Sequence, residues 1–74
     1  MKKASVIGIG RLGLCWALNL EKNGYDVVGM DVNSDYVDSL NNRTFVSKEP
    51  LVDDYLAKST KFKATTDIVE AIEH

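Results

Sequence analysis

Three glycines occur at a regular spacing near the start of the chain, within the stretch SVIGIGRLGLCWALNLEKNGYDVVGMD. Gly8, Gly10 and Gly13 follow a short β-branched run and begin a stretch with helical periodicity. In a Gly-x-Gly-x-x-Gly loop, the first glycine permits a tight turn, the second admits a ligand to the backbone, and the third allows close helix–sheet packing. The N–H groups at the start of a helix also attract an anion. The spacing therefore predicts a loop that binds the pyrophosphate of a dinucleotide.

The candidate binding groups are the main chain of this loop and one carboxylate. The loop residues are Gly8, Ile9, Gly10, Arg11, Leu12 and Gly13. Asp31 lies 18 residues beyond Gly13, at the end of the second predicted strand, where an acid can accept hydrogen bonds from ribose hydroxyls. A carboxylate repels a 2′-phosphate, and no arginine closely follows Asp31, so NAD is favoured over NADP. The glycine loop alone is also compatible with FAD, or with a purely structural turn in which Asp31 is solvated or caps a helix.

Strands and helices alternate along the chain. The β-branched runs predict strands at 4–9, 25–30 and 62–66, and the apolar periodicity predicts helices at 12–23, at 34–41, from residue 50 and from residue 68. Gly24 is predicted to end the first helix in a left-handed cap, and Asn33 or Ser34 to begin the second. Asp67 and Glu70 resemble a capping box for the last helix.

This alternation predicts an α/β fold with a parallel sheet. Three parallel strands with their helices form about half of a doubly wound dinucleotide-binding sheet, so we expect a partial Rossmann fold that stops before the fourth strand. The first strand lacks polar alternation after Ser5, which predicts burial on both faces. Without a fourth strand beside it, the first strand becomes an edge of the sheet.

Length, composition and charge limit the function classes. The 74 residues suit one small domain at most, and they are 45% hydrophobic and 27% charged with a net charge of −2. The sequence has no basic block of the kind that binds nucleic acids, and no apolar run approaches the roughly 20 residues that cross a membrane. We therefore expect neither a nucleic-acid partner nor a membrane span. The single cysteine, Cys15, cannot form an internal disulfide, which fits a reducing compartment. We therefore expect a cytoplasmic protein. The paired acids, such as Asp53 and Asp54, are interpreted as solvated helix faces, so no metal site is predicted.

Four segments occur in the order and spacing of a known family. The segments KKASVIGIGRLGL, GYDVVGMDVN, EPLVDDYL and KATTDIVEAI resemble the N-terminal domain of the UDP-glucose/GDP-mannose dehydrogenases, the nucleotide-sugar dehydrogenases, over essentially the whole chain. The resemblance implies NAD as cofactor, with the phosphate loop at 8–13 and the ribose acid at Asp31. It also implies a homo-oligomeric parent enzyme that oxidises the 6-hydroxyl of a nucleotide sugar to a carboxylate with two NAD, through a cysteine thiohemiacetal.

The sequence departs from the family pattern in three places. Arg11 and Leu12 replace the usual Tyr-Val pair; Arg11 either adds a positive charge near the phosphates or is a solvated side chain. Tyr36 occupies the position of a frequent Lys or Arg five residues after the ribose acid, and it is expected to pack on its helix. The family's YEPGL is replaced by KEPLV, so no tyrosine or glycine role transfers there.

No catalytic residue is assigned to this chain. The family's catalytic cysteine, lysine, asparagine and aspartate lie beyond residue 74. Cys15 is interpreted as a small apolar residue of the first helix, and His74 as a helix-end residue. We therefore expect residues 1–74 to be the N-terminal, non-catalytic part of the NAD-binding domain of a nucleotide-sugar 6-dehydrogenase. The alternatives are a stand-alone dinucleotide-binding or interaction module, or the half-domain of another NAD-dependent dehydrogenase, such as a β-hydroxyacid dehydrogenase.

Overall fold

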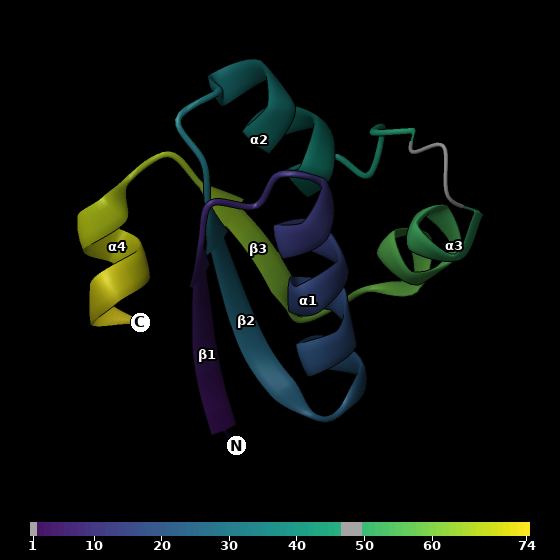
Figure 1. The fold of residues 1–74 in the computed structure, drawn as a ribbon, viewed down its shortest axis with the longest axis horizontal. Helices are drawn as coiled ribbons and strands as arrows, with labels where there is room; N and C mark the ends of the chain where they lie inside the picture. Colours follow the sequence, from purple (N-terminus) through teal and green to yellow (C-terminus); the bar gives the residue numbers. More distant parts are fainter. Residues whose placement is uncertain (1, 47–49) are drawn as a thin grey trace.

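The computed structural model describes residues 2–46 and 50–74, which form a three-stranded parallel sheet with helices on both of its faces (Figure 1). The strands, in the order β1-β2-β3, are β1 (Lys2–Ile7), β2 (Tyr25–Met30) and β3 (Phe62–Thr65). Both pairs are parallel, and the register places Gly29 of β2 opposite Ala64 of β3. The predicted α/β fold with three parallel strands is confirmed.

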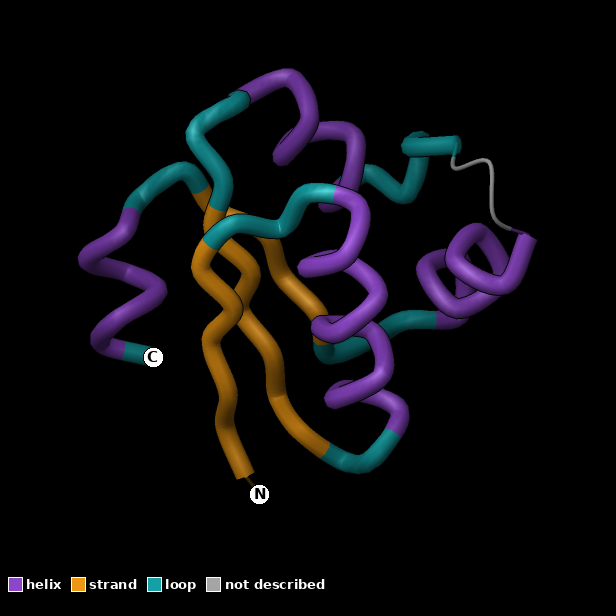
Figure 2. Tube along the Cα trace, in the orientation of Figure 1, coloured by secondary structure: helices purple, strands orange, loops and turns teal. Residues whose placement is uncertain are grey.

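Four helices surround this sheet. They are α1 (Arg11–Lys22), α2 (Ser34–Asn41), α3 (Pro50–Lys58) and α4 (Ile68–Glu73). Helix α1 covers one face of the sheet with α3 beside it, α4 covers the other face, and α2 lies at the end toward which all strands point. The loops that follow the three strands gather at that same end (Figure 2). In open parallel sheets this is the end at which ligands bind.

Local sequence signals place most helix ends correctly. The Asn33 side chain accepts a hydrogen bond of 3.0 Å from the Tyr36 N–H and so caps α2. Gly24 adopts a φ of 95° directly after the C-cap of α1, which is the predicted left-handed ending. Strand β2 has the predicted bounds, α1 begins and ends one residue earlier than predicted, and β3 ends one residue earlier than predicted. Helix α3 begins at Pro50, as predicted for proline in a first helical turn.

The predicted capping box of α4 is only half formed. The Asp67 carboxylate accepts a hydrogen bond of 2.9 Å from the Val69 N–H and one of 3.4 Å from the Glu70 N–H. Glu70 does not return a hydrogen bond to Asp67, because its carboxylate forms an ion pair of 3.1 Å with Lys63 of β3. The Asp67 N–H donates instead to the Thr65 hydroxyl, at 3.0 Å.

The prediction for the first strand was wrong in its bounds and in its burial. Strand β1 covers Lys2–Ile7, because Gly8 turns the chain out of the sheet with a φ of 86°. Its residues are half-buried or exposed, and Ile7 keeps 52% of its surface accessible. The reason is the predicted edge position, which is confirmed: β1 pairs with β2 alone within the described residues.

The hydrophobic core lies between the sheet and the layer of α1, α2 and α3. Its buried members are Ile9, Leu14, Ala17, Leu18, Val27, Val37, Leu40, Val52, Leu56, Phe62 and Ala64. The apolar residues Val37 and Leu40 of α2 and Val52 and Leu56 of α3 thus face the core, and Leu20 and Tyr55 pack at its margin. The side chain of Leu51, and Lys48 and Glu49 of the KEPLV segment, lie outside the described part of the chain.

Helix α1 approaches the turn after β1 very closely at Gly13. A Cβ atom at Gly13 would lie 2.1 Å from the Gly8 carbonyl oxygen, a separation at which backbone must move. A Cβ atom at Gly10 would have no neighbour within 4 Å. The two glycines of one loop therefore differ: Gly13 is required for packing, whereas Gly10 leaves open space.

This difference predicts different costs for the same substitution. Gly13→Ala is expected to lower the free energy of unfolding by about 1–3 kcal/mol, since the added methyl group forces α1 away from the turn. Gly10→Ala is the matched control and should cost less than about 1 kcal/mol, the size of an N-cap effect. Thermal or urea unfolding followed by circular dichroism measures both, and equal losses would contradict the packing role of Gly13.

Candidate dinucleotide-binding site

The glycine loop, residues 8–13, lies at the end of the sheet toward which the strands point: residues 8–10 connect β1 to α1, and residues 11–13 form the first turn of α1. The Gly8 N–H donates a hydrogen bond of 2.8 Å to the Met30 carbonyl at the end of β2. The left-handed φ of 86° at Gly8 is rarely adopted by residues that carry a side chain. The loop thus starts from a fixed point on the sheet, which agrees with the tight turn predicted there.

Ile9 takes part in the loop through its main chain, because its side chain is fully buried. That side chain fills a notch above β2 that exists because residue 29 is glycine. A Cβ atom at Gly29 would lie 2.7 Å from Ile9 Cγ2 and 3.1 Å from Phe62 Cε1. The prediction from sequence placed Ile9 in the strand and did not single out Gly29. An isolated glycine inside a β-branched strand is the signal that could have revealed this close approach.

Gly10 is the open position of the loop. It is exposed, caps the N-terminus of α1, and has empty space where a side chain would begin. Its carbonyl accepts the hydrogen bond of 2.8 Å from the Leu14 N–H that starts the helical ladder. The N–H groups of residues 11–13 therefore come before the first hydrogen bond of the helix, at the positive end of the helix dipole.

The first turn of α1 differs electrostatically from those of the other helices. All of α1 is described, and it has no acidic residue in its first turn. The other three helices each have one there: Asp35, Asp53 and Glu70. The side chains of Arg11 and Leu12 are exposed and do not pack into the core. These observations fit an anionic ligand at this helix end.

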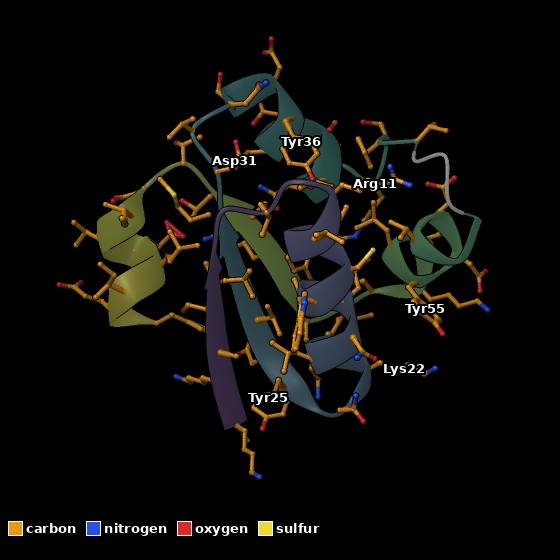
Figure 3. All side chains as sticks on the ribbon, viewed as in Figure 1. Arg11, Lys22, Tyr25, Asp31, Tyr36 and Tyr55 are labelled. Atoms are coloured by element: carbon orange, nitrogen blue, oxygen red, sulfur yellow. The ribbon has the colours of Figure 1, made fainter. Side chains whose placement is uncertain are left out.

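Asp31 follows β2 directly and lies at the same end of the molecule as the glycine loop (Figure 3). Its N–H donates to the Thr65 carbonyl at 3.0 Å, which extends the pairing of β2 with β3. Its Oδ1 accepts a hydrogen bond of 3.1 Å from the Asn33 N–H, which orients the carboxylate in an Asx turn. Asn33, not Asp31, caps the following helix, so the alternative of Asp31 as a capping acid is excluded.

Tyr36 of α2 is joined to the glycine loop, which its position in the sequence did not show. Its hydroxyl donates a hydrogen bond to the Ile9 carbonyl. Its ring packs edge-on against Phe45, which lies beyond the end of α2, with ring centroids 5.2 Å apart. Partial burial, together with the nearby carboxylate of Asp31 and thiol of Cys15, raises the pKa of the Tyr36 phenol above its usual value.

The residues that could carry other chemistry lie apart from one another. Cys15 is half-buried in α1 and packs against the core, which agrees with an apolar role. His74 follows α4 on the other face of the sheet, where its Nε2 lies 2.9 Å from the Asp26 carbonyl oxygen. Within the described residues, no group of three or more His, Cys, Asp or Glu is arranged to hold a metal ion. The described helices also include none that is long and apolar enough to span a membrane.

The three parallel strands in the order β1-β2-β3, with helices on both faces, form the first half of a domain of the doubly wound type. The family model for the NAD binding domain of the UDP-glucose/GDP-mannose dehydrogenase family matches residues 2–74. The chain belongs to this family, as the resemblance predicted, and the cofactor of the family's domain is NAD.

Individual relatives agree with this assignment. The chain is 37% identical over 73 residues to GDP-mannose 6-dehydrogenase of Pseudomonas savastanoi pv. phaseolicola, a match of 95% of this chain and 17% of the relative. It is 46% identical over 50 residues to UDP-N-acetyl-D-mannosamine dehydrogenase of Methanococcus maripaludis, covering 68% of this chain and 12% of the relative.

A solved structure shows the same fold. A UDP-glucose dehydrogenase from the archaeon Pyrobaculum islandicum superposes with a TM-score of 0.87 and 29% identity, over 97% of this chain and 17% of that one. The chain thus spans about one sixth of the length of the relatives that it matches along nearly its whole length.

The open space at Gly10 generates a prediction about binding. Gly10→Val should keep the circular dichroism spectrum and lower the free energy of unfolding by no more than about 1 kcal/mol, the size of an N-cap effect, because a Cβ atom there meets nothing. The branched side chain should occupy the approach to the loop and reduce NAD binding below detection in a calorimetric titration. Full NAD affinity in this variant would show that the glycine shapes the turn and does not admit a ligand.

Proposed function

We propose that residues 1–74 form the N-terminal part of the NAD-binding domain of a nucleotide-sugar 6-dehydrogenase. One observation supports this most directly: the open backbone at Gly10, at a helix N-terminus without an acid, lies at the same sheet end as the oriented Asp31 carboxylate. The family match over residues 2–74 favours this assignment over a β-hydroxyacid dehydrogenase or an interaction module.

Each part of the site has a separate role in this proposal. The main-chain groups of the glycine loop, residues 8–13, hold the pyrophosphate, and Ile9 contributes there only through its backbone because its side chain is buried. Asp31 accepts hydrogen bonds from the adenosine ribose hydroxyls, and its negative charge disfavours a 2′-phosphate. Bound NAD supplies the hydride acceptor. The residues of this chain bind and orient the cofactor and contribute no catalytic group.

The substrate of the whole enzyme is proposed from the names of its relatives. Since these act on GDP-mannose and on UDP-N-acetyl-D-mannosamine, according to their names, the substrate is proposed to be a UDP- or GDP-sugar that is oxidised to the uronate with two NAD. We further propose a homo-oligomer in the cytoplasm. The single cysteine of the sequence supports a reducing compartment.

Substitution of Asp31 tests the cofactor assignment. Asp31→Ala should weaken NAD binding by roughly tenfold, the scale of a hydrogen bond to a charged group, and should reduce the preference for NAD over NADP. Asp54→Ala, which removes an exposed carboxylate of α3, is the control for the loss of one negative charge. Calorimetric titration with both cofactors measures the effect, and an unchanged NAD/NADP preference in the Asp31 variant would refute the assignment.

A further inference from the structure

The Tyr36 side chain connects two parts of the site that are far apart in the sequence. Its hydroxyl donates to the carbonyl of Ile9, 27 residues earlier, in the middle of the glycine loop. The ring also makes an edge-on contact with Phe45. In Figure 3, Tyr36 lies between Asp31 and Arg11 at the end of the molecule where the loop is found. The phenol is therefore a fixed donor directed at one peptide group of the loop.

That peptide group joins Ile9 to Gly10. A trans peptide is planar, and its carbonyl and N–H bonds point in opposite directions. A hydrogen bond that holds the Ile9 carbonyl toward α2 therefore turns the Gly10 N–H away from α2. The surroundings of Gly10 are open, since a Cβ atom there would have no neighbour within 4 Å. The phenol thus sets the orientation of the one main-chain N–H at the open position of the loop.

A second path of hydrogen bonds joins Tyr36 to Asp31. The Tyr36 N–H donates to Asn33 Oδ1 at 3.0 Å, and the Asn33 N–H donates to Asp31 Oδ1 at 3.1 Å. The backbone that carries the phenol and the carboxylate proposed to bind ribose are thus joined by two consecutive hydrogen-bonded turns, the Asx turn at 31–33 and the N-cap of α2 at 33–36. Their separation is set by these two turns.

We infer that Tyr36 is a positioning residue that holds the glycine loop in the geometry that receives a diphosphate, at a defined distance from Asp31. The inference rests on the proposed function for its ligand, although the effect on the loop exists in the ligand-free chain. The raised pKa of the phenol keeps its proton, and hence its donor role, through the neutral and mildly alkaline range. Tyr36 acts through the Ile9 carbonyl and is not placed in contact with the cofactor.

The test uses Tyr36→Phe, which removes the hydroxyl and keeps the ring that packs against Phe45. Tyr55→Phe is the matched control, because the Tyr55 hydroxyl accepts a hydrogen bond of 2.9 Å from Lys22 Nζ, between α3 and the end of α1. In the ligand-free chain, amide NMR shifts of residues 9–13 should change in the Tyr36 variant. They should remain in place in the Tyr55 variant. Unchanged loop shifts in Tyr36→Phe would overturn the inference.

Binding gives the second readout. Well below the unfolding temperature, Tyr36→Phe should weaken NAD and ADP by roughly three- to tenfold, the range for one lost hydrogen bond, and Tyr55→Phe should bind both as the unchanged chain does. Equal affinities in the two variants would overturn the inference. If the unchanged chain binds neither NAD nor ADP, the proposed function fails, while the NMR comparison still decides whether Tyr36 positions the loop.

Discussion

The close contact between α1 and the turn after β1 is the constraint on which the site depends. At Gly13 the helix backbone comes so near to the Gly8 carbonyl that even a methyl group would overlap with it. This contact determines where α1 begins relative to the sheet. It therefore also determines where the positive end of the helix dipole lies relative to the ends of the strands. A larger residue at position 13 would change both at once.

Three further contacts fix the loop between these two elements. The Gly8 N–H is bound to the Met30 carbonyl, the Ile9 side chain is buried over Gly29, and the Ile9 carbonyl receives the Tyr36 hydroxyl. These contacts hold the N–H of Gly8 and both the side chain and the carbonyl of Ile9, so the loop has little freedom to rearrange. A loop that is already ordered loses less conformational entropy when it binds a ligand.

In the described part of the chain, the two edge strands of the sheet differ in whether side chains bond to their outer backbone groups. Along the outer edge of β3, the Asn41 side-chain amide exchanges two hydrogen bonds of 2.8 Å with the backbone of Ala64. Arg43, in a left-handed conformation, donates to the Phe62 carbonyl at 2.9 Å. Strand β1 forms the other edge, and its Ile7 is half exposed. Side chains of the α2 region thus satisfy the β3 edge, whereas β1 offers a strand edge of the kind that pairs with further chain.

The sequence by itself determined the features that depend on neighbouring residues. The glycine spacing, the bounds of β2, the cap at Asn33 and the acid at Asp31 are local, because turn geometry and helix capping involve residues within a few positions. The tertiary structure alone decided the shifted and exposed β1, the notch at Gly29 and the hydroxyl of Tyr36 on the Ile9 carbonyl. These join residues about 20 or more positions apart, or depend on which strand lies beside another, and such contacts leave no periodic signal in a single sequence.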